Sequence, residues 1–323
     1  MNILVTGGAG YVGGTVATVL MQAGHTVTVL DNLCHSKRHE LPAGASFVEA
    51  DIADRPRVES LLRELKPDGV LHFAALIEAG ESMQKPEIYF RNNTASTLAL
   101  LEAMLATGTN KLVFSSTAAV YGEPKSTPIE ETAALAPTNA YGESKLMVEQ
   151  MLSWFHRIHG LRYASLRYFN VAGALPHRGE AHEPETHIIP LILDVALGRR
   201  DKIFIFGDDY DTPDGTCIRD YIHVLDLADA HILALSALDH HGKMIYNLGN
   251  GSGFSVKQVV EAARRVTGHA IPVEIKPRRP GDPARLVASS AQAQANLGWQ
   301  PKHPQLDDIL ASAWAWHQQR YKP

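Results

Sequence analysis

Short apolar runs alternate with longer segments of helical periodicity over the first half of the chain. The runs at residues 3–6, 26–30, 46–49, 70–73, 111–115 and 163–166 are rich in β-branched residues and are continuous rather than alternating. Continuous runs are typical of strands that are buried on both faces. The segments 12–23, 57–65, 94–106 and 141–159 carry helical spacing and end close to Gly24, Pro67, Gly108 and Gly160. This order predicts an α/β fold of the Rossmann type, a doubly wound parallel sheet with helices on both faces.

The texture of the sequence changes after Asn170. Residues 173–186 and 207–217 are rich in Gly, Pro, Asp and His, and the elements between them are short. Long irregular loops in a compact protein are more often functional than accidental. We therefore expect a dinucleotide-binding domain over residues 1–172 and a smaller C-terminal substrate-binding domain over residues 173–323. Part of the segment 219–250 is expected to return and pack on the first domain.

Composition narrows the class of protein. Of the 323 residues, 45% are apolar and 20% are charged, which is typical of a globular protein in solution. The net charge of -5 gives no general attraction for nucleic acid. Two cysteines, Cys34 and Cys217, are too few for a disulfide framework or a structural zinc site. Because no segment has the pattern of a membrane span or a signal peptide, we expect a cytoplasmic protein without a membrane partner.

A glycine-rich turn joins the first strand to the first helix. Residues 7–13 read GGAGYVG, with Gly7, Gly10 and Gly13 at the spacing that lets a backbone approach a pyrophosphate at a helix N-terminus. Asp31 ends the second strand, where a carboxylate binds the adenine-ribose diol and repels a 2′-phosphate. A glycine turn alone is weak evidence, but the order of strand, glycines, helix, strand and acid predicts an NAD site.

Three side chains with acid–base chemistry are predicted to converge beside that site. Tyr141 and Lys145 lie four residues apart on one face of a helix, and Thr117 follows the strand 111–115 at the ligand-binding edge of the sheet. A Tyr/Lys pair alone also fits a solvated helix face. In combination with the glycine turn, the three residues favour oxidation of a secondary alcohol, which needs a base for its O–H proton.

The chemistry assigns a role to each of the three. Tyr141 is the predicted base, and its ordinary pKa of about 10 must fall by roughly three units, or about 4 kcal/mol, to act near neutrality. The Lys145 cation and the positive nicotinamide ring are the charges that stabilise a phenolate. Thr117 is predicted to orient the substrate oxygen by hydrogen bonding.

These motifs, together with others along almost the whole chain, resemble the extended short-chain dehydrogenase/reductase family. Within that family the likeness is to the enzymes that epimerise UDP-hexoses. HFAA at 72–75 and YGESKLM at 141–147 belong to it, as do RYFN at 167–170 and YNLG at 246–249. The segments RDYIHV at 219–224 and PRRPGD at 277–282 point to UDP-sugar enzymes in particular.

The resemblance implies a homodimer that inverts the C4 hydroxyl of a UDP-hexose through a bound 4-keto sugar, with tightly held NAD, in galactose metabolism. It implies a cofactor site made by Gly7, Gly10, Tyr11, Val12, Gly13, Asp31, Asn32, Asp51, Ile52, Phe73, Ala74, Ala75, Asn92, Tyr141, Lys145 and Phe169. It implies a UDP-sugar site made by Thr117, Asn170, His187, Ile188, Phe204, Ile205, Phe206, Arg219, Arg279, Asp282 and Leu286.

The sequence departs from the family pattern at a few positions. Thr117 stands where many members have serine, and Ile77 stands where many have a lysine that contacts NAD. His187 and Ile188 replace a frequent Asn-Leu pair on the uridine side. Leu286 falls where members carry either a bulky tyrosine or a smaller residue beside the sugar, so it predicts graded acceptance of N-acetylated sugars.

Other interpretations stay open. A UDP-N-acetylglucosamine or UDP-uronate 4-epimerase would keep the same motifs, whereas a sugar 4,6-dehydratase is disfavoured because Ala118 and Ala119 follow Thr117. A regulator that senses NAD(P) without catalysis would not need the Tyr/Lys pair. The acidic segment 208–214 fails the calcium-loop pattern and the sixteen histidines show no ligand spacing, so we expect no metal. The apolar positions Leu98, Leu101, Leu105, Met147, Met151, Leu152 and Phe155 fit either a dimer interface or the core.

Overall fold

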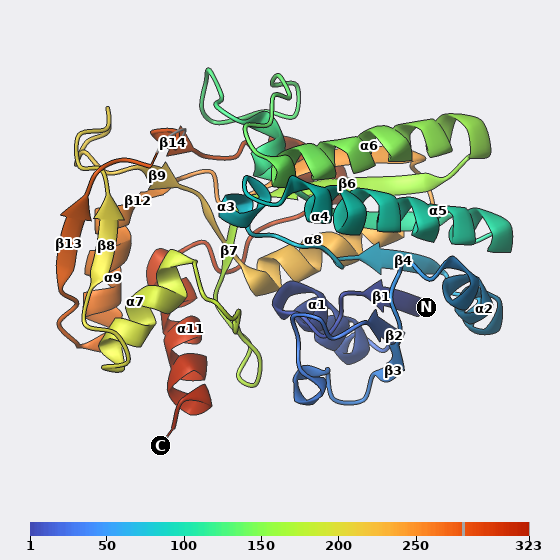
Figure 1. Ribbon diagram of the computed structural model, residues 1–323, viewed down its shortest axis with the longest axis horizontal. Helices are drawn as coiled ribbons and strands as arrows, with labels where there is room; N and C mark the ends of the chain where they lie inside the picture. The colour runs from blue at the N-terminus through green and yellow to red at the C-terminus, as the bar shows by residue number, and fades with distance from the viewer. Residues whose placement is uncertain (280–281, 323) are drawn as a thin grey trace.

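A seven-stranded parallel sheet forms the centre of the molecule in the computed structural model, which describes residues 1–279 and 282–322 (Figure 1). The strand order is β11-β6-β5-β4-β1-β2-β3, and every neighbouring pair is parallel. Pro280 and Gly281, which belong to the last predicted motif, lie outside the described residues. The strands are β1 (Asn2–Thr6), β2 (Thr26–Asp31), β3 (Ser46–Glu49), β4 (Gly69–His72), β5 (Lys111–Thr117), β6 (Arg162–Tyr168) and β11 (Lys243–Leu248).

The strand order has its switch point between β1 and β4. The chain runs outward from β1 through β2 to β3, then crosses back and runs outward from β4 through β5 to β6. Loops leaving the carboxyl ends of β1 and β4 therefore diverge, and the crevice between them is where ligands bind in such sheets. The predicted fold class is confirmed.

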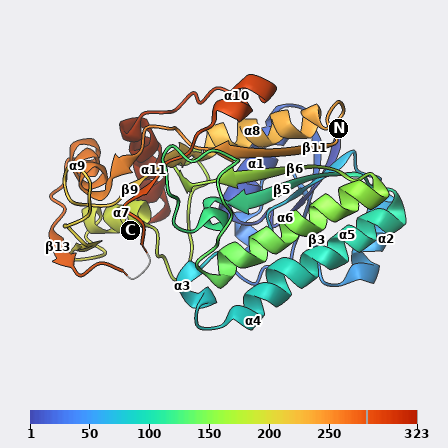
Figure 2. The same cartoon turned by 90° about the horizontal axis from the view of Figure 1, so that it is seen from above.

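Helices cover both faces of this sheet. On one face α1 (Tyr11–Gln22) and α8 (Val224–Ala237) share a core that includes Val16, Leu20 and Leu227. On the other face α2 (Arg55–Leu65), α5 (Ser96–Thr107) and α6 (Ala140–His159) share a core that includes Leu61 and Leu100 (Figure 2). None of the helices in the described part of the chain combines the length and the apolar character that a membrane span needs.

The helix expected at 94–106 begins earlier than the apolar pattern indicates. The short helices α3 (Ala79–Ser82) and α4 (Pro86–Tyr89) precede a π-helical turn, Phe90–Ala95, which runs directly into α5. The buried Asn93 explains this turn, because its side chain bonds both backbone groups of Leu76 and the hydroxyl of Ser144. Such π turns are frequent at functional sites, and this one presents Asn92 to the large cavity described below.

The second half of the chain contributes to two regions. Residues 224–248 lie against the central sheet, because α8 packs on it and β11 pairs with β6 along Lys243–Leu248. Most of the remainder builds a separate core, at the left of Figure 1. Its elements are β7 (Asn170–Ala172), α7 (Ile188–Ala196), β8 (Ile203–Phe206), β9 (Ile218–Arg219), β10 (Tyr221–His223), β12 (Phe254–Ser255), α9 (Val256–Thr267), β13 (Val273–Lys276), β14 (Arg285–Leu286) and α11 (Leu306–Arg320). The helix α10 (Ala291–Leu297) instead packs on α8 and β11 of the first region.

One buried carboxylate in the 219–224 motif connects three segments of the second half of the chain. Asp220 is fully buried, and its two oxygens accept hydrogen bonds from the backbone N–H groups of Asn250, Gly251 and Ala288 at 2.7–3.0 Å. Bonds of this number satisfy a buried carboxylate in the absence of a cation. Asp220 is therefore a structural member of the 219–224 motif.

Candidate active site

A cavity of about 1290 Å³ opens at the carboxyl ends of the central strands. It takes its walls from the glycine turn, from the ends of β2, β4, β5 and β6, and from the segment 177–187. Among the residues predicted from the sequence, those that line it are Gly7, Gly10, Tyr11, Val12, Gly13, Asp31, Asn32, Asp51, Ile52, Phe73, Ala74, Ala75, Asn92, Thr117, Tyr141, Lys145, Phe169, Asn170 and His187.

Glycine is needed at each of the three positions of the turn for a different physical reason. Gly7 has a φ of +72°, and a Cβ there would lie 2.5 Å from the backbone nitrogen of Ala74. A Cβ at Gly13 would lie 2.4 Å from the carbonyl oxygen of Gly7. At Gly10 the nearest atom to an added Cβ is 3.4 Å away, so this glycine leaves room on the cavity side. Because Gly10 caps α1 without a side-chain hydrogen bond, the first N–H groups of the helix suit a pyrophosphate.

The different surroundings of Gly13 and Gly10 predict different outcomes for alanine substitutions at the two positions. Gly13→Ala is expected to lower the melting temperature of the nucleotide-free protein, because its Cβ meets backbone. Gly10→Ala is expected to leave that temperature unchanged and to reduce the nucleotide that copurifies. Thermal unfolding and quantification of released nucleotide check both, and equal nucleotide content in Gly10→Ala and wild type would contradict the assignment.

Asp31 holds the glycine turn to the end of β2. Its carboxylate accepts hydrogen bonds from the backbone N–H of Ala9 at 3.1 Å and of Leu33 at 2.9 Å. Burial raises the pKa of Asp31, and these two hydrogen bonds oppose the rise. A carboxylate has about four acceptor positions, so two remain for hydroxyl donors such as a ribose diol. Next to it, Asn32 donates to Asp51 at 2.9 Å, which gives the adenosine end a polar wall.

The predicted catalytic residues meet at the other end of the cavity. Thr117 is the last residue of β5, and Tyr141 lies in the first turn of α6. Both residues line the cavity, and Thr117 lies close enough to Tyr141 to lower the pKa of its phenol. The Thr117 hydroxyl accepts from the backbone N–H of Ala119 at 3.1 Å, which fixes its direction. The Lys145 ammonium, one turn along α6, donates to the carbonyl oxygen of Ser115 at 2.9 Å.

Burial dominates the electrostatics of this group. Burial raises the pKa of Tyr141, the nearby Thr117 side chain opposes the rise, and the charge of Glu78 adds to it. Burial lowers the pKa of Lys145 to about 7. The sequence predicts that nearby positive charge lowers the Tyr141 pKa, but Lys145 does not shift it, and burial dominates at both side chains. The other positive charge named in that prediction, an oxidised nicotinamide ring, would have to come from a bound cofactor.

A buried ion pair supports α6 beneath the catalytic residues. The Arg167 guanidinium donates to both oxygens of Glu149, at 2.9 and 2.5 Å, and each side chain is less than 5% exposed. Glu149 also accepts from the hydroxyl of Ser116, and Arg167 donates to Tyr121. A paired and fully hydrogen-bonded charge of this kind fixes geometry more than it adds stability. Arg167, in the 167–170 motif, therefore positions the strand end that carries Thr117.

The predicted UDP-sugar residues fall into two groups. Thr117, Asn170 and His187 line the cavity, whereas Ile188, Phe204, Ile205, Phe206, Arg219, Arg279, Asp282 and Leu286 do not. Arg219 and Asp282 form an ion pair, and the Arg279 guanidinium lies 4.0 Å from the centroid of the Phe206 ring. Ile205 is 2% exposed and its side chain belongs to the core of the second region, so a ligand can reach only its backbone.

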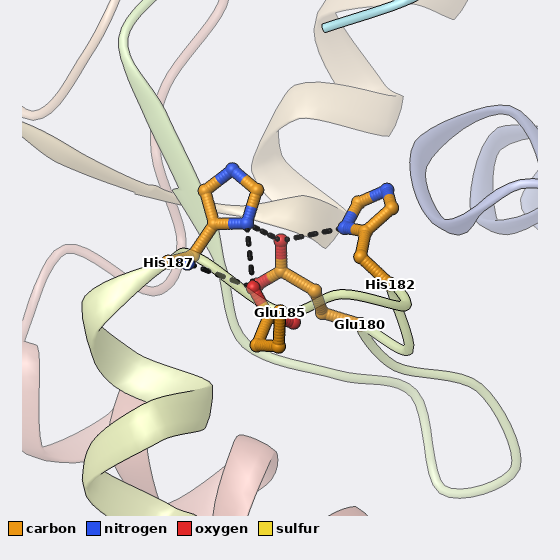
Figure 3. Close-up of side chains that lie close together, drawn as sticks. All are labelled: Glu180, His182, Glu185 and His187. Carbon is orange, nitrogen blue, oxygen red and sulfur yellow. Dashed lines mark hydrogen bonds and ion pairs between the residues drawn. The ribbon is translucent and has the colours of Figure 1, made fainter. Parts of the chain in front are cut away.

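Two features of the segment 177–187 could not be predicted from the sequence. The Arg178 side chain donates to the carbonyl oxygens of Ala9 and Gly10 and so closes over the glycine turn. Further along, the carboxylates of Glu180 and Glu185 meet the imidazoles of His182 and His187 (Figure 3). No spacing rule for helices or strands indicates either feature, because the segment is irregular and only the fold brings its side chains together.

A helix N-terminus free for a pyrophosphate and a phenol–hydroxyl pair at opposite ends of one cavity place the molecule among the dinucleotide-binding enzymes of the Rossmann class. The chain belongs to the NAD dependent epimerase/dehydratase family, whose model matches residues 3–249.

Relatives that share the name UDP-glucose 4-epimerase align with almost the whole chain. A UDP-glucose 4-epimerase of Corynebacterium glutamicum is 54% identical over 315 residues, which are 98% of this chain and 95% of that protein. A crystal structure of a UDP-glucose 4-epimerase superposes with a TM-score of 0.97 at 49% identity, over 100% of this chain and 99% of the other. The Bifidobacterium longum UDP-glucose 4-epimerase in complex with NAD⁺ and UDP has a TM-score of 0.93 at 39% identity, over 99% of both chains.

Proposed function

We propose that this protein is a UDP-glucose 4-epimerase that interconverts UDP-galactose and UDP-glucose with bound NAD. The observation that carries the proposal is the meeting of Thr117, Tyr141 and Lys145 on the wall of one dinucleotide-sized cavity, with Thr117 close enough to lower the Tyr141 pKa. The family and the names of its relatives support the same reaction. Incubating the purified protein with UDP-galactose, without added nucleotide, tests it. We expect UDP-glucose to form, and no product from nucleotide-loaded protein would refute it.

The residues around the cavity fit NAD. The uncapped start of α1 suits the pyrophosphate, the two free acceptor positions of Asp31 suit the ribose diol, and Asn92 and Phe169 lie at the catalytic end. The Asp31 carboxylate would repel a 2′-phosphate, which favours NAD over NADP. When bound, the cofactor supplies a hydride acceptor that later acts as a hydride donor.

The chain's own residues handle the proton. Thr117 holds the C4 oxygen of the sugar, and Tyr141 removes its proton while the C4 hydride leaves, which gives a 4-keto sugar. Lys145 lies one helical turn behind Tyr141 and bonds to Ser115, so it fixes the surroundings of the phenol. After the keto sugar turns in the pocket, Tyr141 returns the proton and the hydride adds to the opposite face of C4. Electrons and protons balance without net oxidation.

The UDP group is assigned to the second region. Arg219 and Arg279 would bind its diphosphate through charge-assisted bonds, with Asp282 holding Arg219 in place. Asn170, His187 and Ile188 would contact it from the side of the cavity, and Phe204 and Phe206 are half-buried surfaces for its uracil base. The Arg279–Phe206 stack shows that this arginine already lies over one of them.

Leu286 is assigned to sugar specificity. It pairs with Arg219 through β14 and β9, and it packs against the cluster that contains Val120, Tyr121 and Leu146, as Phe169 also does. These contacts support a position between the proposed diphosphate site and the strand end of Thr117. Its volume is intermediate between those of tyrosine and of small residues, so UDP-N-acetylhexosamines should be turned over slowly but measurably.

Leu286→Tyr is expected to reduce kcat/KM for N-acetylated sugars more than for UDP-galactose. A misfitting group in such a pocket costs roughly 1–3 kcal/mol, or about 10–200-fold. The measurement is the ratio of kcat/KM for the two sugars in wild type and variant. An unchanged ratio would show that Leu286 does not face the C2 substituent.

A homodimer through α5 and α6 is also proposed. Leu98, Leu105 and Met147 from the predicted apolar positions are exposed, and so are Trp154 and Ile158 on α6. Leu101 and Leu152 are instead buried in the core. An exposed apolar face on two adjacent helices marks an association surface. Ile158→Glu should shift the mass in solution from two chains to one, as light scattering would report, whereas a wild type of single-chain mass would refute the dimer.

A further inference from the structure

Four potential metal ligands meet within one short segment on the wall of the cavity. The His187 Nδ1 atom lies 2.9 Å from Glu180 Oε1 and 2.8 Å from Glu185 Oε1, and His182 Nδ1 lies 3.3 Å from Glu180 Oε1. One ligand atom from each residue lies within 4.8 Å of all the others. Zinc bonds of about 2.0–2.1 Å place tetrahedral ligands about 3.3 Å apart. The four atoms therefore need only small shifts to surround one ion.

A second observation, independent of the clustering, concerns an acceptor without a donor. Glu185 Oε1 accepts from the backbone N–H groups of Thr186 and His187, at 2.8 and 2.7 Å. Its other oxygen, Oε2, is buried and has no hydrogen-bond partner. A buried carboxylate oxygen left in this state is costly. If Glu185 binds an ion through Oε2, this oxygen gains a partner while Oε1 keeps its two backbone hydrogen bonds.

The charge of the cluster is compatible with a divalent cation. Glu180 is only 9% exposed, and within 4.0 Å the described residues offer no lysine or arginine to either carboxylate. Their ion pairs come from His182 and His187 alone. A dication with two carboxylates and two neutral imidazoles has no net charge.

We propose that Glu180, His182, Glu185 and His187 bind one divalent ion of the zinc type. Two imidazole nitrogens and two carboxylate oxygens suit a borderline ion, whereas Ca²⁺ and Mg²⁺ prefer six or more oxygen ligands. Four protein ligands leave no open position, which is typical of a structural rather than a catalytic zinc site. The ion plays no part in the proton transfer at Tyr141.

The position of the site indicates which segment of the chain a bound ion would hold in place. The segment between β7 and α7 has no long element of its own, yet it carries Arg178 onto the glycine turn and supplies His187 as the cap of α7. Figure 3 shows the second ring nitrogen of His187 pointing away from the two glutamates. With Nδ1 on the metal, this Nε2 atom is the donor. If the proposed function holds, it can donate to a phosphate of the nucleotide sugar.

Cobalt binding to the intact, nucleotide-loaded protein tests the site. After removal of metal with a chelator, Co²⁺ should bind at one equivalent per chain with the intense visible absorption of tetrahedral cobalt. Protein purified with zinc in the medium should hold one zinc per chain by elemental analysis. His182→Ala and Glu185→Gln should each weaken Co²⁺ binding by at least about 100-fold, which exceeds the effect of changing an outer-shell partner.

Matched controls separate the possible outcomes. The double variant His240→Ala/His241→Ala removes two exposed, adjacent histidines and should bind like wild type. If His182→Ala fails to fold, the near-isosteric Glu185→Gln decides. Binding well below one equivalent, or equal binding by wild type and Glu185→Gln, would overturn the proposal and leave a proton-bridged ion cluster. The readout is independent of turnover, so it fails or succeeds separately from the epimerase assay.

Discussion

Replacing Tyr141 with phenylalanine is expected to lower kcat for UDP-galactose by about 10²–10⁴-fold, the usual contribution of a positioned acid–base group. The aromatic ring stays in place, so the packing of α6 and the binding of UDP should change little. Only the proton acceptor for the C4 hydroxyl is lost. Steady-state kinetics give kcat, and a binding measurement on the same preparation gives the affinity for UDP.

The matched control is Tyr163→Phe. Tyr163 is a fully buried tyrosine on β6 that does not line the cavity. Its loss of a hydroxyl should leave kcat unchanged. If Tyr141→Phe kept near-normal turnover, Tyr141 could not be the base, and the role would have to pass to another group that reaches the C4 oxygen.

The central fold could be predicted because its strands are buried on both faces. The run at 3–6 lies within β1, and the run at 111–115 marks β5, which continues to Thr117. Short apolar runs bounded by turn residues are typical of such strands. β11 was expected only as part of a returning segment, because its pairing with β6 joins residues that lie far apart in the chain.

The site could be predicted where a backbone conformation or a helical spacing demands particular residues. Gly7 and Gly13 are fixed by close backbone contacts, and Tyr141 and Lys145 by one turn of α6. Arg178 and the cluster at 180–187 had no such signal. Their side chains meet the rest of the site through the path of an irregular segment, and no local pattern encodes that path. The expectation of no metal had the same cause, because the sequence shows no ligand spacing at these residues.

The buried lysine shows where function conflicts with stability. Burial lowers the pKa of Lys145 to about 7 from its ordinary value of 10.5. A difference of about 3.5 units corresponds to about 5 kcal/mol. Lys145 is charged in both states below pH 7, so the whole cost is present there. Between pH 7 and 10.5 the folded protein releases the proton while the unfolded chain keeps it, and the cost falls as the pH rises. Above pH 10.5 it is gone.

Lys145→Met is therefore expected to abolish most activity and yet to stabilise the nucleotide-free protein. The variant leaves the carbonyl of Ser115 without its donor, at about 1–3 kcal/mol, so the net gain is about 2–4 kcal/mol at pH 6–7. For a chain of this size that is a rise of several degrees in melting temperature. The gain should shrink as the pH approaches 10. Thermal unfolding from pH 6 to 10 measures this gain, and nucleotide must be removed first because ligand binding also stabilises the folded state.

The control is Lys125→Met, at an exposed loop position, which should show neither the gain nor its pH trend. A variant less stable than wild type at pH 6 would mean that the lysine contributes more to the fold through its contacts than its burial costs.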